Sequence, residues 1–499
     1  MATNRREFLK GTAWMGFLAA AASGCVSKGL KSCAMPATMQ GFKADPIKTP
    51  VKVGFVGVGR RAMGALKRIS SIPGMRITAV CDLLPERIAA AQEVLKQNKA
   101  PAAKEFLGPN GYDAMLQEDL DVVYNVTPWN LHASFGVKAM NAGKHVMIEV
   151  PAAMTLEECW ELVETAERTK KHCMQLENCA YGEAEMLCLN LVRKGLLGEV
   201  FHGEAAYIHD LHAKCYFDAQ PDPRKYPNGY TDHWRLKHNA KHKGNQYATH
   251  GLVPVSQYMN INRGDRFETL VSLETNQFTY EKFAAKKYPG TWKENLKIAM
   301  GNMNQSIIRT AMGRTILVQH DVSSPRPYSR LNVCSGTNGI FTGITFVGDQ
   351  LDEFGYSLGN PVRFCWKEEG KEHINTFFPY KKMKLFREEY KHPLWKQVGK
   401  AAQLIGGHGG MDFIMDLRWC YCLQNGLPLD TDVYDLAATC AVAELSERSV
   451  RSGGNAVDVP DFTRGGWKTA KPLGIVDIDL VKMGFDPNAV AEDKNALNV

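Results

Sequence analysis

The sequence of 499 residues predicts an α/β protein in which a doubly wound parallel sheet precedes an α+β domain with a mostly antiparallel, open sheet. A glycine turn near residue 57 joins a buried strand to a helix. Strand and helix patterns then alternate as far as residue 177. After residue 198, strand-like segments follow one another, which is typical of antiparallel sheets.

The glycine turn has the features of a dinucleotide-binding site. Val51 to Val56 form a short apolar run that suits a buried parallel strand. Gly57 and Gly59 allow a sharp turn and a close approach to a pyrophosphate, which the N-terminus of the next helix attracts. Asp82 ends the second strand, where a carboxylate accepts hydrogen bonds from the adenosine ribose and favours NAD over NADP. This context predicts a Rossmann domain over residues 50–177; the alternative is a chance glycine turn in a non-binding α/β unit.

The remaining elements of this domain follow from hydrophobic periodicity. Helical patterns and short apolar runs alternate, and Thr155 is placed to cap one of the helices. The expected helices are 60–72, 85–97, 130–141 and 156–169, and the expected strands are 121–127, 144–149 and 172–177.

Residues 178–455 form the predicted substrate domain. Its strands are expected at 199–208, 268–274, 314–320 and 339–346, and a long helix at 433–450. The aromatic and polar stretch 207–258 falls between strands and is the expected substrate loop. Residues 456–499 are expected to form an irregular tail.

Residues 1–25 have the pattern of an export signal. Arg5 and Arg6 precede Phe-Leu-Lys, which resembles a twin-arginine signal, and the apolar stretch 11–22 is too short for a stable membrane helix. Ala-Ser-Gly-Cys at 22–25 resembles a lipoprotein cleavage box, in which Cys25 carries the lipid; the alternative is cleavage after a small residue without lipid. We therefore expect an exported protein of the periplasm or cell envelope, with a linker at 26–49.

Composition excludes several other classes of protein. The net charge of +7 is mild, and no basic run is interleaved with aromatics, so nucleic-acid binding is not expected. The 13 cysteines form no C-x-x-C pair, and several lie in apolar stretches typical of buried thiols. No H-E-x-x-H or closely spaced Cys/His set occurs, so no metal site is predicted.

The order of the motifs resembles the Gfo/Idh/MocA oxidoreductases. Gly57-Val-Gly59, Asp82, Asn125-Val-Thr-Pro128 and the segment 144–151 match that family in sequence order. The resemblance implies a Rossmann domain followed by an α/β domain whose open sheet carries a sugar site. Most members have Glu-Lys-Pro where this chain has Glu149-Val150-Pro151, so a plain sugar dehydrogenase would lack its usual lysine.

A narrower set of motifs resembles glycoside hydrolase family 109, whose members are NAD-dependent α-N-acetylgalactosaminidases. The matching segments are 129–132, 149–151, 176–181, 207–210, 233–235, 244–251 and 406–412, and the similarity extends over nearly the whole mature chain. The resemblance implies a retaining redox route: oxidation of the sugar at C3 by bound NAD, removal of the C2 proton, elimination at C1, addition of water and reduction at C3. The alternatives are an NAD-dependent sugar or polyol dehydrogenase and a non-catalytic sugar-binding protein.

The resemblance also implies the site residues. Proton transfer suits Tyr and His, and the implied catalytic residues are Tyr207, His209, Tyr247 and His250. His250 is expected to replace the lysine at the C3 hydroxyl, and Tyr207 or His209 to serve C2 or the leaving group. The implied substrate-binding residues are Glu177, Arg235 and Tyr328. The implied cofactor-binding residues are Gly57, Gly59, Arg60, Arg61, Asp82, Trp129, Asn130, Leu131, His132, Glu149, Val150 and Asn178.

Two interpretations remain open in this set. The paired arginines are also compatible with a 2′-phosphate, although Asp82 would repel one. His408 lies in a glycine-rich segment and is interpreted as structural or as part of a subunit contact in a homo-oligomer.

Overall fold

The computed structural model describes residues 38–212, 230–343, 362–368 and 373–490. The expected signal and the first part of the linker, residues 1–37, lie outside this part of the chain. Among the described helices, none is both long enough and apolar enough to cross a membrane.

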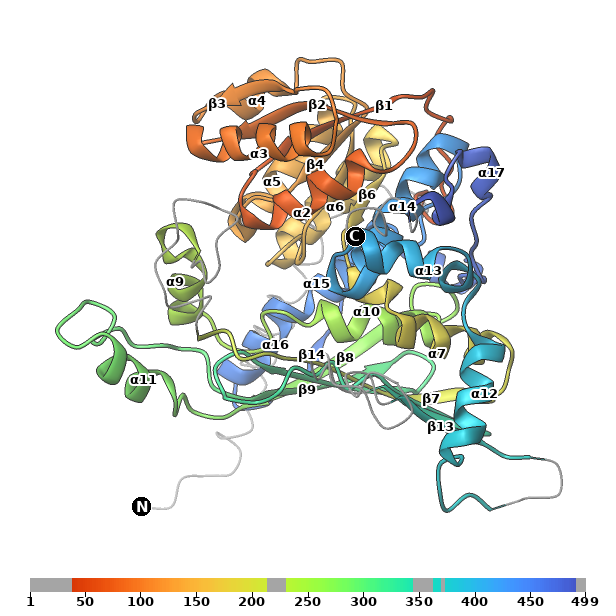
Figure 1. The fold of residues 1–499 in the computed structure, drawn as a ribbon. Coiled ribbons are helices and arrows are strands. Elements are labelled where there is room, and N and C mark those ends of the chain that lie inside the picture. Colours follow the sequence, from red (N-terminus) through yellow and green to blue (C-terminus); the bar gives the residue numbers. More distant parts are fainter. Residues whose placement is uncertain (1–37, 213–229, 344–361, 369–372, 491–499) are drawn as a thin grey trace, which may run out of the picture.

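The N-terminal domain is a six-stranded parallel sheet with strand order β3-β2-β1-β4-β5-β6, which is the doubly wound arrangement predicted from the sequence. Figure 1 shows this domain in the upper part of the molecule, beside α14 (Met411–Asn425) and α17 (Leu480–Met483). Its strands are β1 (Val51–Val56), β2 (Met75–Asp82), β3 (Lys104–Leu107), β4 (Val122–Asn125), β5 (His145–Ile148) and β6 (Cys173–Gln175). Its helices are α2 (Arg60–Ser70), α3 (Pro85–Gln97), α4 (Gly111–Met115), α5 (Trp129–Asn141) and α6 (Leu156–Thr169).

The expected elements of this domain are confirmed to within a few residues, and local chemistry explains their ends. Thr155 accepts a hydrogen bond from the Glu158 backbone, and the Glu158 side chain bonds back, so a capping box begins α6. Strand β3 was not predicted, because it has only one buried residue, Phe106, and it lies at the edge of the sheet.

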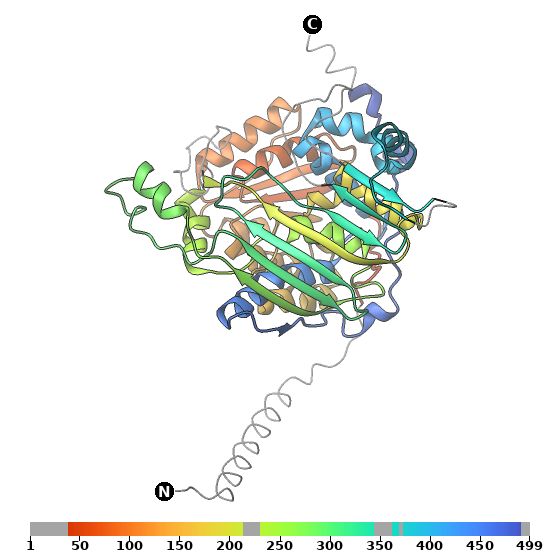
Figure 2. The ribbon, with the colours of Figure 1, turned by 90° about the horizontal axis from the view of Figure 1, so that it is seen from below.

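The second domain is built on an eight-stranded sheet with order β13-β12-β11-β7-β10-β9-β8-β14. Of the pairs within it, β7 and β10 run parallel and the rest are antiparallel, which confirms the mostly antiparallel prediction. Figure 2 shows one face of this sheet, which no described helix covers. Its strands are β7 (Val200–Ile208), β8 (Phe267–Glu274), β9 (Asn304–Thr310), β10 (Thr315–Asp321), β11 (Val333–Gly336), β12 (Gly339–Gly343), β13 (Val362–Trp366) and β14 (Val457–Asp458).

Some helices of the second domain lie between the two sheets, whereas others extend beside them (Figure 1). The expected single helix at 433–450 is wrong in detail, because it is divided at Ala441 into two helices, although Ala441 keeps right-handed helical torsion angles. The helices are α7 (Glu183–Arg193), α9 (Trp234–Lys241), α10 (Thr249–Tyr258), α11 (Tyr280–Lys287), α12 (Tyr380–Tyr390), α13 (Pro393–Ile405), α14 (Met411–Asn425), α15 (Val433–Cys440), α16 (Val442–Arg451) and α17 (Leu480–Met483). Short 3₁₀ helices are η1 (Asn178–Tyr181), η2 (Thr231–His233), η3 (His408–Gly410) and η4 (Gly466–Lys468).

Both segments that flank the two domains pack against them. The Met39 backbone donates to the Tyr434 hydroxyl over 3.4 Å, and the Ile47 backbone donates to the Leu423 carbonyl over 3.0 Å. In the C-terminal segment, β14 extends the second sheet and Phe462 is buried. Residues 38–49 and 456–490 therefore contribute to the folded body.

Candidate functional site

The glycine turn lies in the loop between β1 and α2, at the carboxyl edge of the parallel sheet. Gly57 has φ +82°, and a Cβ atom there would lie 2.8 Å from the Thr127 backbone nitrogen, so only glycine fits. No side chain in the described residues caps the N-terminus of α2. Backbone N–H groups at such an end attract phosphate. The loop between β1 and α2 therefore fits the pyrophosphate of a dinucleotide.

Asp82 stands at the end of β2, as expected for a ribose-binding carboxylate. It accepts a hydrogen bond from the Leu84 backbone over 3.0 Å. Burial raises the pKa of Asp82, and the hydrogen bonds that it accepts oppose this effect. A ribose hydroxyl would add a donor to a carboxylate that is already partly removed from water.

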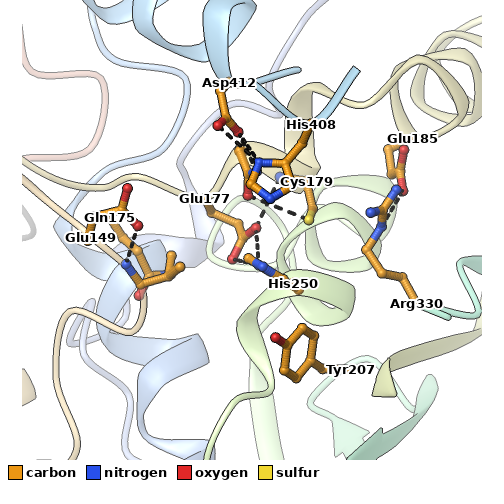
Figure 3. Close-up of polar contacts among 12 residues, drawn as sticks. Glu149, Gln175, Glu177, Cys179, Glu185, Tyr207, His250, Arg330, His408 and Asp412 are labelled. Carbon is orange, nitrogen blue, oxygen red and sulfur yellow. Dashed lines mark hydrogen bonds and ion pairs between the residues drawn. The ribbon is translucent and has the colours of Figure 1, made fainter. Parts of the chain in front are cut away.

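A histidine and a glutamate from separate elements meet in the site (Figure 3). Glu177 follows β6 and is 2% exposed, and His250 lies in the first turn of α10. The distances from His250 Nδ1 to the two carboxylate oxygens of Glu177 are 2.8 and 3.0 Å. Burial would raise the pKa of Glu177, but His250 and the hydrogen bonds to the carboxylate lower it below its usual value. The carboxylate therefore fixes the imidazole with Nδ1–H toward Glu177, which leaves Nε2 available as a base.

Close packing of α10 on β7 brings this histidine to the aromatic residues. A Cβ atom at Gly251 would lie 2.3 Å from the Ala206 backbone nitrogen, so the glycine allows helix and strand to touch. The His250 ring centroid is consequently 5.2 Å from that of Tyr207 and 4.9 Å from that of Tyr247. Tyr247 precedes α10 by two residues, and its side chain contacts that of His250.

Tyr207 is the centre of the aromatic group. Its hydroxyl is 3.0 Å from His209 Nδ1, and its ring is 4.5 Å from Tyr247 and 6.1 Å from Tyr328. Burial raises the pKa of Tyr247 and of Tyr328 well above the usual value of a phenol. Both hydroxyls therefore stay protonated at neutral pH and can donate hydrogen bonds to a substrate.

Arg235 joins this group to the Rossmann domain. The guanidinium carbon lies 4.6 Å from the Trp129 ring and 5.1 Å from the Tyr247 ring, and Nη1 donates to the Tyr230 hydroxyl over 3.1 Å. Cation–π contacts of this kind hold a guanidinium flat against the rings. Val150, at the position of the usual lysine, is buried in the same cluster as Trp129 and Tyr207.

Comparisons with known proteins decide between a hydrolase and an oxidoreductase family. The family model for the glycosyl hydrolase 109 C-terminal domain matches residues 181–469, and the NAD-binding Rossmann fold of the oxidoreductase family matches 51–176. A glycosyl hydrolase family 109 protein of Shewanella amazonensis is 44% identical over 480 residues, with 95% of this chain and 99% of the relative covered. The chain belongs to glycosyl hydrolase family 109. Its first domain is an NAD-binding Rossmann domain of the oxidoreductase family.

Other relatives are consistent with this membership of family 109. An α-N-acetylgalactosaminidase of Shewanella oneidensis is 44% identical over 430 residues, with 85% of this chain and 88% of the relative covered. A levoglucosan dehydrogenase solved with NADH and levoglucosan has TM-score 0.55 and 16% identity, with 82% of this chain and 100% of that chain covered. This structural likeness shows that the two proteins share a fold.

The family 109 chain brings most of the predicted site residues together in two groups. Glu177, Tyr207, His209, Arg235, Tyr247, His250 and Tyr328 meet around Val150 and Trp129. Gly57, Gly59 and Asp82 line the glycine turn and its neighbouring strand end, and Arg60 begins α2. Asn130 is exposed at the start of α5 and Leu131 is half-buried.

His132 is placed as a support for the loops beside the site. It is buried, and its two ring nitrogens lie 2.7 Å from the carbonyl oxygens of Thr127 and Pro151. The ring therefore connects the loop after β4 with the Glu149-Val150-Pro151 segment.

Arg61 pairs with carboxylates from both domains. Its Nε donates to Glu149 over 2.6 Å, and Nη1 donates to Asp412 over 2.7 Å. Burial opposes the charge of Arg61, but Asp412 and Glu149 raise its pKa well above the usual value. Since these carboxylates already engage the guanidinium, the geometry does not favour a 2′-phosphate-binding role.

Sequence reasoning missed Asp412 and assigned no cofactor or substrate role to His408. Asp412 is fully buried at the start of α14 and accepts hydrogen bonds from Arg61 and from Asn178 Nδ2, the latter over 2.5 Å. Its pKa lies well below the usual value, because Arg61, His408 and Arg68 together outweigh its burial. The signal was present in Gly-Gly-His-Gly-Gly-Met-Asp at 406–412, but Arg61 and Asn178, which donate to Asp412, are more than 230 residues away in the sequence.

One cluster in the described residues has the composition of a metal site. Glu177, Cys179 and His250 offer ligand atoms that all lie within 4.8 Å of one another. Burial raises the pKa of the Cys179 thiol well above its usual value, whereas a metal ligand must be the thiolate. Glu177 already accepts hydrogen bonds from His250 and from the Cys179 backbone. The donor set favours a hydrogen-bonded Glu–His pair, and the absence of a metal stays a prediction.

Proposed function

We propose that this protein releases terminal α-linked N-acetylgalactosamine from glycans with retention of configuration, and that bound NAD takes part in every turnover. The observation that carries the proposal is a Glu177–His250 pair and three tyrosines packed around the position where related oxidoreductases have lysine. The name of the Shewanella oneidensis relative supports the choice of sugar.

The residues present fit the nucleotide. Gly57 and the uncapped end of α2 would hold the pyrophosphate, Asp82 the adenosine ribose, and Asn178 and Glu149 the nicotinamide half. NAD, when bound there, supplies reversible oxidation of the C3 hydroxyl of the sugar.

His250 is proposed to move the proton of the C3 hydroxyl. Its Nδ1 is held by Glu177, so Nε2 accepts this proton on oxidation and returns it on reduction. The negative Glu177 stabilises the imidazolium that forms in between. Val150 supplies no ammonium group, so the Glu–His pair does the work of the missing lysine.

The second proton transfer, at C2, is proposed for the Tyr207–His209 pair. The Tyr207 hydroxyl and His209 Nδ1 are 3.0 Å apart and can exchange a proton. Tyr247 and Tyr328 remain neutral phenols, so they act as hydrogen-bond donors to the sugar or to the leaving oxygen. Arg235 is positioned to hold a hydroxyl or the N-acetyl carbonyl.

The rival function is net dehydrogenation of a sugar or polyol. Levoglucosan dehydrogenase shares the fold of this chain, so the experiment must distinguish dehydrogenation from hydrolysis. Purified protein is incubated with nitrophenyl α-N-acetylgalactosaminide without added nucleotide. Steady release of nitrophenol without accumulation of NADH is the expected result. Reduction of the bound NAD to NADH, with at most one sugar oxidised per bound NAD and no glycoside cleavage, would establish the dehydrogenase instead.

We also propose that the protein is exported through its twin-arginine-like segment and that Cys25 is the site of lipid attachment. The Arg5-Arg6 pair and the 22–25 box support this proposal. Radiolabelled palmitate incorporated into the wild-type protein, and absent from Cys25→Ser, is the expected outcome. Whether the protein forms a homo-oligomer is testable by light scattering.

A further inference from the structure

The loop between α13 and α14 holds one side chain in an unusual backbone. Gly406, Gly407, His408, Gly409 and Gly410 all have positive φ, at 98°, 92°, 47°, 70° and 103°. Histidine tolerates the left-handed region only at a cost, whereas glycine enters it freely. Such a conformation persists where the surrounding structure holds it, and it occurs often at functional sites.

Asp412 fixes the orientation of the His408 ring. Nδ1 lies 3.1 and 3.0 Å from the two carboxylate oxygens of Asp412, so the proton on Nδ1 points to that carboxylate. The neutral imidazole then carries a lone pair on Nε2. The side chain of His408 is 58% exposed, so this nitrogen is accessible to a ligand.

His408 lies where the nicotinamide half of a dinucleotide is expected. Its Nδ1 is 3.4 Å from Asn178 Nδ2 and 3.4 Å from Arg61 Nη1. Arg61 is in the first turn of α2, after the phosphate loop, and Asn178 follows β6. A dinucleotide lies across the carboxyl ends of such a sheet, with its adenosine near β2 and its nicotinamide over the opposite half. Figure 3 shows His408 and Asp412 beside Glu177, on the side of the site away from Tyr207.

We propose that His408 is a further cofactor-binding residue, whose Nε2 accepts a hydrogen bond from a hydroxyl of the nicotinamide-side ribose. The second domain thereby closes over the dinucleotide, and the Arg61–Asp412 ion pair, with N and O 2.7 Å apart, holds the closed arrangement. The inference rests on the proposed function, in which NAD is restored in each turnover. Such an enzyme gains from slow release of NAD, whereas a net dehydrogenase must exchange it.

The test compares two histidine variants in the full-length protein. His408→Asn keeps a donor near the Nδ1 position and tolerates positive φ, but it lacks the Nε2 acceptor. His202→Asn is the matched control, because His202 is a half-exposed histidine on β7 with Glu204 3.9 Å away. NAD dissociation is followed by exchange against excess etheno-NAD, and retained NAD is measured after acid extraction.

We expect NAD to dissociate from His408→Asn about tenfold faster than from the wild type, which corresponds to the loss of one hydrogen bond. Added NAD should restore its turnover, and the control should behave as the wild type. His408→Gly, which also relieves the positive φ, should reproduce the result if His408→Asn folds poorly. Dissociation within twofold of the wild type in the folded variants would overturn the role of His408. A wild-type protein that hydrolyses substrate while holding no NAD would instead overturn the proposed function.

Discussion

Replacement of Glu177 by glutamine tests the proton-transfer pair with little change in shape. Glu177 is buried, and its carboxylate receives His250 Nδ1 at 2.8 Å and the Cys179 backbone at 3.0 Å. Glutamine fills the same volume and can still accept both hydrogen bonds, but it lacks the negative charge that stabilises the imidazolium. The variant should therefore fold and bind NAD while turning over slowly.

The size of the expected fall in kcat follows from the hydrogen bond between His250 and Glu177, which loses its charged partner in the variant. A hydrogen bond to a charged partner contributes about 1.5–3 kcal/mol. If that stabilisation is lost in the transition state, kcat falls about 10- to 150-fold.

The assay measures kcat for nitrophenyl α-N-acetylgalactosaminide together with bound NAD and the melting temperature. Glu447→Gln is the matched control, because Glu447 accepts from His242 Nδ1 over 2.9 Å in a second Glu–His pair on α16. A kcat for Glu177→Gln within threefold of the wild type would refute the role of the Glu177–His250 pair.

Three further predictions follow from other parts of the site and the core. Asp82→Ala should weaken NAD binding about 10- to 100-fold through the loss of charge-assisted hydrogen bonds, and unchanged retention after gel filtration would contradict its placement. Tyr247→Phe keeps the ring packing and removes the donor, so kcat should fall about 10²-fold or more with NAD retained; a near-normal rate would exclude proton donation by Tyr247. The free energy of unfolding should fall as pH drops from 6.5 toward 4, by up to about 1.4 kcal/mol per pH unit for each buried histidine, because burial lowers their folded-state pKa values and the unfolded chain takes up the protons. The histidines are His145 and His320, with pKa values of about 3, and His172, His238 and His392, with pKa values of about 4. Burial raises the pKa of Asp432 to about 7, and this carboxyl group opposes the trend. Urea titrations that show constant stability between about pH 6.5 and 4 would contradict the prediction.

Local patterns were sufficient to predict the parallel sheet. Each of its central strands is a short apolar run, and the turn between β1 and α2 requires glycine for a steric reason that the sequence displays. The edge strand β3 escaped prediction because a half-exposed edge has little periodicity. Strand β9 escaped prediction for a different reason: it lies inside the second sheet, but its alternating buried positions hold polar as well as apolar residues.

The pairing of the site residues was harder to predict from the sequence than the parallel sheet, because these residues meet only after folding. Tyr207, Tyr247 and His250 were predicted from their motifs, and the aromatic contacts between them agree with that grouping. The pairing of His250 with Glu177 spans 73 residues, and that of Arg61 with Asp412 spans 351. No spacing rule connects residues on different domains, so these pairs needed the tertiary structure.

Isotope incorporation at C2 of the released sugar distinguishes the redox mechanism from direct displacement. The proposed route breaks the C2–H bond, and the base that removes this proton can exchange it with solvent. Hydrolysis in deuterated water, followed by NMR of the released N-acetylgalactosamine, should show deuterium at C2, and protein stripped of NAD should be inactive until NAD is returned. Released sugar without deuterium at C2, together with full activity of the stripped protein, would contradict the redox mechanism and leave the nucleotide a structural role.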